Sequence, residues 1–271
     1  MSVRPASTAA DDFPWWLIAL FGLGILLAVL IAINGIYAQV FSTVITGVGM
    51  TVSVTLMAFA LASAWGLVIA VLGMSDSVIL RQISRFYIET LRGIPVLVVL
   101  FYIAFVAAPA VVSLFNWVAT PLIRLGWMEA ALVRDFSLTW RAILALTICY
   151  AAFIAEIFRA GIEAVDEGQI EAAKALGLNR LQRFRLIIFP QAIRTIFPPL
   201  SNDFISMVKD SSLVSVLGVM DITQLGKVYA AGSFRFFETY SIVAYIYLIL
   251  TLGLSLLLRR VERSLRRSPG I

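Results

Sequence analysis

An unbroken run of uncharged residues from Phe13 to Ser75 constrains the fold of this chain more than any other feature. A transmembrane helix needs about 20 apolar residues, so this run can hold two spans, divided by a polar break from Asn34 to Gln39. In lipid, every backbone group must find its hydrogen-bond partner within the protein. A β-barrel would meet this need with alternating segments of about 10 residues, and the sequence has none. The run therefore predicts an all-α integral membrane protein.

Composition and the remaining apolar runs extend this prediction to the whole chain. Apolar residues make up 61% of the sequence and charged residues 14%, whereas a soluble domain carries roughly 25% charged residues. Pro109 is expected to interrupt the third span, and Arg141 is expected to extend from the fourth span to the membrane interface. The predicted transmembrane helices, about six in number, cover approximately residues 15–35, 42–73, 94–112, 138–158, a stretch that starts near Ile196, and 239–258.

The distribution of lysine and arginine predicts the orientation. Most of these residues lie in the N-terminal tail, in the connections 75–92 and 159–194, and after residue 258. By the positive-inside rule these segments, and with them both termini, are cytoplasmic. The net charge of +5 is therefore explained by membrane orientation, and the arginines of 259–271 are expected to meet anionic lipid head groups rather than nucleic acid.

The 159–194 connection contains signals for a helical hairpin. Asp166, with Gln169 three residues later, has the spacing of a helix-capping pair, and the following alanine-rich stretch has high helix propensity. Gly177 supplies a left-handed stop and Asn179 caps a second helix. The narrow face of the first helix, with Leu176 and Ile170 as apolar anchors, suits a groove on a partner protein. A plain connector between two spans fits the same spacing.

Three separated motifs resemble those of one transporter family. Glu171-Ala172-Ala173 with Gly177 and Pro190 is similar to the EAA loop of the permease subunits of ABC importers. The segment 89–95, Glu-Thr-Leu-Arg-Gly-Ile-Pro, resembles the E-x-x-R-G-x-P signature of polar amino-acid uptake permeases, and the segments 201–205 and 209–213 resemble a further motif of theirs. The likeness covers roughly residues 42–260. The chain departs from the usual five-helix core by an extra N-terminal span and a longer outer connection at about 108–137.

The resemblance implies a permease of an ATP-driven importer of polar amino acids in the bacterial inner membrane. The implied partners are a dimer of ATP-binding subunits, a second permease subunit and an extracytoplasmic binding protein, with ATP and Mg bound by the ATPase and no cofactor in this chain. The implied division is a cytoplasmic tail 1–14, an extra transmembrane helix 15–40, a permease domain 41–258 and a basic cytoplasmic tail 259–271. The residues assigned to ATPase coupling are Glu171, Ala172, Ala173, Leu176, Gly177 and Pro190.

Polar groups at membrane depth are costly, so they line a path or pair with a neighbour. Glu156 either faces a cavity or pairs with Arg159, and Glu89 with Arg92 is expected to form a structural pair, both at i, i+3 spacing. The candidate substrate pathway consists of Glu156, Asn202, Asp203 and Ser206, although hydrogen bonds between helices would also explain the last three. The candidate gate, or simply the polar end of a helix, consists of Lys209, Asp210, Ser211 and Ser212.

Other function classes fit the sequence less well. The chain has no histidine and a single cysteine, Cys149, so no His-ligated metal site or histidine base is available, and no catalytic residue is assigned. No phosphate-binding loop is present, since Gly226-Lys227 is followed by Val228 rather than by serine or threonine. The main alternative is a transporter or channel that needs no ATPase. It would be expected to show ionisable residues or broken helices in both halves of the chain.

Overall fold

The computed structural model describes residues 15–267, which form helices and no strand. The long helices are α1 (Trp15–Ile33), α3 (Val48–Gly73), α4 (Val78–Gly93), α6 (Ala108–Arg124), α7 (Leu138–Glu163), α10 (Phe189–Asp210) and α12 (Phe236–Arg267). The shorter elements are α2 (Gly35–Val44), α5 (Val96–Tyr102), α8 (Glu167–Ala175), α9 (Arg180–Arg183) and α11 (Ile222–Ser233). The predicted tail 1–14 and the last four residues lie outside the described part.

The all-helical membrane fold predicted from the sequence is confirmed. Four helical stretches are long and apolar enough to cross a membrane, and a shorter apolar helix, Ile18–Ile33, precedes them. The fifth predicted span corresponds to α10, whose apolar character is reduced by its two internal prolines and by charged residues. The four stretches are Gly35–Gly73, Val96–Arg124, Leu138–Glu163 and Phe236–Leu265.

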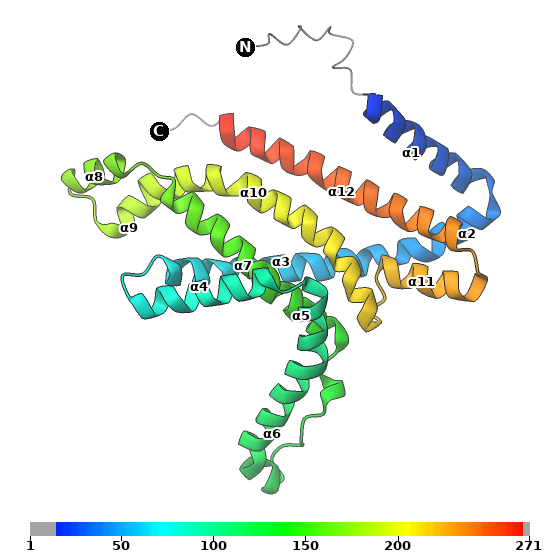
Figure 1. The fold of residues 1–271 in the computed structure, drawn as a ribbon, viewed down its shortest axis with the longest axis horizontal. Coiled ribbons are helices and arrows are strands. Elements are labelled where there is room, and N and C mark those ends of the chain that lie inside the picture. Colours follow the sequence, from blue (N-terminus) through cyan, green and yellow to red (C-terminus); the bar gives the residue numbers. More distant parts are fainter. Residues whose placement is uncertain (1–14, 268–271) are drawn as a thin grey trace, which may run out of the picture.

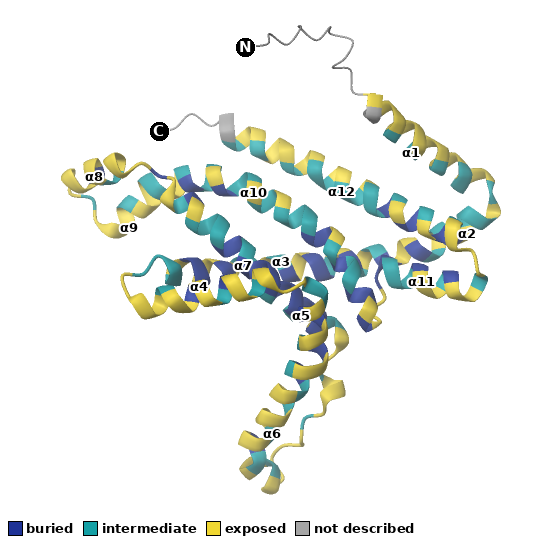
Figure 2. Cartoon of the chain, in the orientation of Figure 1, coloured by how far each residue is buried: buried dark blue, intermediate teal, exposed yellow. Residues whose placement is uncertain are grey.

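The centre of the molecule is the pair α3 and α7 (Figure 1), which are the most extensively packed helices. Small residues at every fourth position of α3, Ala58, Ala62 and Gly66, are buried in this contact. A Cβ atom on Gly66 would lie 3.0 Å from the carbonyl oxygen of Ala151 on α7, so glycine lets the two backbones approach closely. Association through small residues is the usual solution in lipid, where the hydrophobic effect does not drive helices together. Figure 2 shows this central region buried, while α1 and α6 are largely exposed.

The other helices lie around this central pair in three directions. The hairpin of α8 and α9 lies at one end of the molecule, and α1, α2 and α11 lie at the opposite end (Figure 1). The helix that includes α6 projects away from both. A second apolar cluster joins α2 to α11 and α12 through Val40, Val44, Ile222 and Ile242.

The predicted interruption at Pro109 is wrong. Residues Val96–Arg124 form one continuous helical stretch, in which a π-helical turn, Ile103–Ala107, precedes Pro109. Here the Ala108 N–H donates to the Ile103 carbonyl, and the wider turn accommodates the missing N–H of proline. The outer segment 108–137 is therefore an extension of the third span that folds back at residues 125–135, and Asn116 holds the return through two hydrogen bonds to Ala131.

The prediction for Arg141 is also wrong. Its side chain is only 6% exposed and is held inside the protein instead of extending outward. It donates hydrogen bonds to the carbonyl oxygens of Phe136 (2.8 Å), Ala104 (3.0 Å) and Val133. The fold-back of the outer segment brings these carbonyls to the start of α7, where a guanidinium group with five donors can satisfy all three.

Candidate functional site

The hairpin predicted between Asp166 and Pro190 is present, and its caps are those expected from the sequence. The Asp166 carboxylate accepts from the Gln169 N–H at 3.2 Å and begins α8. Gly177 has φ = +78° and ends the helix, with the Leu178 N–H donating back to the Ala173 carbonyl at 3.1 Å. Asn179 and Gln182 cap α9 reciprocally, at 2.9 Å in each direction. Local chemistry therefore fixes a sharp reversal between the two short helices.

Helix α8 is exposed over most of its surface, and Ala173 is its one buried residue. Glu171 and Ala172 are exposed, whereas Ala173 is only 2% exposed and packs inward. Leu176, at the tip, is 81% exposed and is therefore accessible to a groove on a partner protein. The predicted role of Ile170 as a second anchor is wrong, because this side chain packs against Val165, Ala192 and Ile196 of the same chain.

The hairpin is firmly joined to the two long helices that flank it. Gln191 on α10 donates a hydrogen bond from its side chain to the side chain of Gln169 on α8. Beneath this contact, α7 and α10 meet so closely that a Cβ atom on Gly161 would lie 2.2 Å from Ile196 Cγ1. A displacement of α8 would therefore be transmitted to both helices, since packed interiors deform little.

Pro190 lies at the point where the hairpin enters α10. It is exposed and occupies the second position of that helix, directly after the π-helical turn Phe184–Ile188. The Phe189 N–H donates to the Phe184 carbonyl across this turn, as Ala108 does before Pro109. Pro190 thus fixes the junction between α9 and α10.

The predicted ion pairs at i, i+3 spacing are both replaced. Arg92 pairs with Glu156 of α7 instead of Glu89, and its guanidinium lies over the Phe153 ring, 5.7 Å from the centroid. Arg159 pairs with Glu163 at 2.9 Å instead of with Glu156. The reason is that α4 packs along α7 and brings its C-terminal end, with Arg92, to Glu156. The Glu89 side chain lies on the exposed surface of α4.

The candidate pathway residues of α10 divide between two environments. Asn202 is exposed, whereas Asp203 and Ser206 are half-buried. The Oδ2 atom of Asp203 is buried and has no hydrogen-bond partner within the described part of the chain. The neighbouring Phe204 packs against Phe59 of α3, with ring centroids 4.7 Å apart, which fixes the rotation of α10 at this level. An unsatisfied carboxylate oxygen in this setting can bind a cation or a hydrogen-bond donor.

The candidate gate residues do not form a Lys209–Asp210 pair. Lys209 is exposed, and the Asp210 carboxylate accepts a hydrogen bond from the Tyr150 hydroxyl on α7 at 2.8 Å. Ser211 is buried and donates to the Val208 carbonyl at 2.8 Å, while Ser212 is half-buried at the start of a 3₁₀ turn, Ser211–Leu217. This polar end of α10 is thus tied to α7.

Two buried polar residues, Tyr150 and Asp221, were not among the predicted candidates. Tyr150 lies in an apolar span, and a buried hydroxyl needs a hydrogen-bond partner, which would have indicated a polar contact there. Asp221 is fully buried at the start of α11, where its carboxylate accepts from the Gln224 N–H at 2.8 Å and from the Tyr247 hydroxyl at 3.2 Å. Its spacing to Gln224 is a capping pattern that the sequence displays.

Several membrane-spanning helices, with a capped helical hairpin between two of them, are the arrangement expected of an ABC importer permease. The family model described as "Binding-protein-dependent transport system inner membrane component" matches residues 62–267, and the chain belongs to this family. Helix α1 precedes the matched region.

Several relatives and solved structures are similar to the chain. It is 36% identical over 227 residues to the probable amino-acid permease protein YxeN of Bacillus subtilis, covering 84% of this chain and 93% of YxeN. It is 37% identical over 188 residues to the glutamine transport system permease protein GlnP of Escherichia coli, covering 69% of this chain and 77% of GlnP. The crystal structure of an amino acid ABC transporter with histidines aligns with a TM-score of 0.67 at 37% identity, covering 84% of this chain and 95% of that one.

Proposed function

We propose that this chain is the membrane-spanning permease subunit of an ATP-driven importer of polar amino acids. The family membership gives the permease class, and relatives described as amino-acid or glutamine permeases support the substrate class. The implied assembly contains two ATP-binding subunits, a second permease subunit and an extracytoplasmic binding protein. ATP and Mg would be held by the ATPase, and the chain itself would carry no ATP site.

The observation that carries this proposal is the exposed face of α8. Glu171, Ala172 and Lys174 are among its exposed residues, and Leu176 adds a large exposed apolar side chain at the tip. Such a helix fits a groove on a partner, where the leucine becomes buried. Ala173 is only 2% exposed, so its side chain faces the rest of the chain and is not available to the partner.

Coupling would proceed through the rigid connection of the hairpin to the spans. Closure of the ATPase dimer on ATP would displace α8, and the contacts of Gln169 with Gln191 and of Gly161 with Ile196 would carry the displacement into α10 and α7. The pathway would then open alternately to the two sides of the membrane, a two-state transition biased by nucleotide. By the positive-inside rule, the basic connections support a cytoplasmic location of the hairpin and both termini, with the chain in the inner membrane of a bacterial cell.

The substrate pathway is proposed to run along α10. Asp203 is the best-supported residue, because its unsatisfied carboxylate oxygen would bind the ammonium group of an amino acid. Asn202 and Ser206 would add hydrogen bonds from the same helix, whereas Glu156 is already engaged by Arg92 and would act through that pair. The gate would consist of Lys209, Asp210, Ser211 and Ser212, with the Tyr150–Asp210 hydrogen bond holding its closed position.

The affinity of the permease for its ATPase tests the proposal. Leu176→Ala should weaken binding by about 2 kcal/mol, roughly 30-fold, because a leucine buried on binding contributes this much. Ile79→Ala is the matched control, since Ile79 is 72% exposed at the start of α4 on the same predicted side of the membrane but outside the hairpin. Equal affinities of the two variants for the purified ATPase subunit would contradict the docking role of α8.

A further inference from the structure

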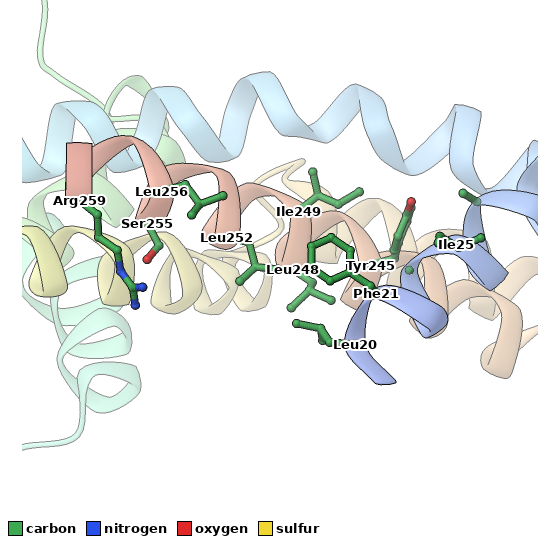
Figure 3. A pocket seen from close by; sticks show the side chains of 12 residues that line it. Leu20, Phe21, Ile25, Tyr245, Leu248, Ile249, Leu252, Ser255, Leu256 and Arg259 are labelled. Atoms are coloured by element: carbon green, nitrogen blue, oxygen red, sulfur yellow. The ribbon is translucent and has the colours of Figure 1, made fainter. Parts of the chain in front are cut away.

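An apolar groove lies between α1 and α12, away from the hairpin and from α10. Its volume is about 520 Å³, within the range of ligand-binding cavities. One face of α1 and one face of α12 form its walls (Figure 3). The lining residues of α1 are Leu20, Phe21, Gly24, Ile25 and Ala28, and those of α12 are Tyr245, Leu248, Ile249, Leu252, Ser255, Leu256 and Arg259.

The two ends of the groove differ in chemistry. Along most of its length the walls are leucine, isoleucine and phenylalanine, and several of these side chains, such as Phe21 and Leu256, are exposed. Ser255 and Arg259 lie together at one end, as Figure 3 shows. Arg260 and Arg263 follow at the same end of α12, so the local charge is positive even with Glu262 between them.

We propose that this groove is a binding site for one anionic phospholipid, whose phosphate meets Arg259 and whose acyl chain lies between α1 and α12. The basic end of α12 is the predicted cytoplasmic end, and the cytoplasmic leaflet supplies anionic lipids. From Arg259 to Tyr245 the groove extends over about 21 Å of helix. Half of a bilayer core is about 15 Å thick, so an acyl chain anchored at Arg259 spans its leaflet within the groove.

The lipid would have a structural role. Helix α1 packs mainly against α2 and makes few contacts with α12, from which it diverges toward its N-terminus (Figure 1). An acyl chain in the gap would supply the missing apolar contacts between the two helices. The bound lipid would thereby fix the position of a helix that lies outside the family-matched region. This inference depends on insertion into a membrane and is independent of the transported substrate.

Two glycines of α1 provide a matched pair of variants. A Cβ atom on Gly24 would meet nothing within 4 Å, so Gly24→Leu places a side chain in the groove without a clash. Gly22 is equally open but does not line the groove, so Gly22→Leu makes the same chemical change outside the site. Arg259→Gln, with Arg260→Gln as its control, tests the charged end in the same way.

Native mass spectrometry of the full chain in its assembly, in detergent with added phosphatidylglycerol or phosphatidylcholine, measures the bound lipid. We expect phosphatidylglycerol to be retained preferentially by the unaltered chain and by Gly22→Leu. We expect at least fivefold weaker retention for Gly24→Leu, and about fivefold weaker retention for Arg259→Gln than for Arg260→Gln. Equal retention by all four variants, or no preference for the anionic lipid, would overturn the proposal.

Photocrosslinking identifies what occupies the groove in the membrane. The photoreactive residue p-benzoylphenylalanine at position Phe21, in vesicles that contain phosphatidylglycerol, should give an adduct with the mass of one phospholipid. The Gly24→Leu background should lose this adduct. A crosslink to a second copy of the chain or to another protein would show that a partner helix covers the groove, and would refute the lipid site.

Discussion

Replacement of Gly177 by alanine changes the backbone conformation at the end of α8 without introducing a side-chain clash. Gly177 has φ = +78°, and a Cβ atom there would meet nothing within 4 Å, so the cost comes from the backbone conformation alone. For an L-residue this conformation costs about 1–2 kcal/mol. The ratio of molecules with the chain reversal after α8 to molecules without it should therefore fall by about 5- to 30-fold. The spans should remain intact, because the reversal lies outside them.

Substrate-stimulated ATP hydrolysis by the assembled complex reports this loss. Asparagine tolerates the left-handed region better than alanine does, and valine tolerates it least. Coupling should therefore decrease in the order Gly177, Asn, Ala, Val. Gly232→Ala is the control, since this glycine is equally open within α11 and lacks a positive φ. A flat series, in which all four residues support the same hydrolysis, would refute the requirement for a left-handed stop.

Three further predictions concern buried contacts and are tested through thermal unfolding of the purified protein. Arg141→Met should lower the unfolding free energy by about 3 kcal/mol, because three carbonyls lose a charged donor, and unchanged stability would contradict this role. Gly161→Ala should cost about 1–3 kcal/mol and should be partly restored by Ile196→Ala, whereas additive losses would exclude a direct clash. Asp221→Ala should cost about 1–2 kcal/mol and Asp221→Asn clearly less, since asparagine can still cap α11.

Local signals in the sequence predicted the hairpin well. Asp166, Gly177 and Asn179 act through hydrogen bonds and backbone conformations within a few residues, and each takes the predicted role. The apolar runs likewise predicted the spans, since lipid leaves the backbone few other choices. These features depend on neighbours along the chain and are therefore visible without tertiary structure.

Features that depend on packing between distant segments could not be predicted in this way. Arg92 finds Glu156, 64 residues away, because α4 lies along α7, and no local spacing indicates this contact. Arg141 is buried because the outer segment folds back and presents three carbonyls to it. Pro109 continues a helix because a π-helical turn precedes it, and such turns leave little trace in residue type.

Asp221, one of the two missed polar residues, had a local signal in the sequence. The Asp221 and Gln224 spacing is a capping pattern of the same kind as that of Asp166 and Gln169. Tyr150 is different, because its partner Asp210 lies on another helix, and only the three-dimensional arrangement reveals that the end of α10 is tied to α7. The exposed tip at Leu176 was predicted as an anchor, whereas the inward packing of Ile170 required the structure.

ATP-dependent uptake tests the central claim most directly. The chain would be reconstituted in vesicles with the proposed ATPase, second permease subunit and binding protein. The entry of a labelled polar amino acid such as glutamine would be measured with and without ATP on the ATPase side. We expect uptake only with ATP, and its loss in parallel with ATPase binding in the Leu176→Ala variant. Uptake by the chain alone, driven by an ion gradient and unaffected by ATP, would contradict the account and indicate a secondary transporter.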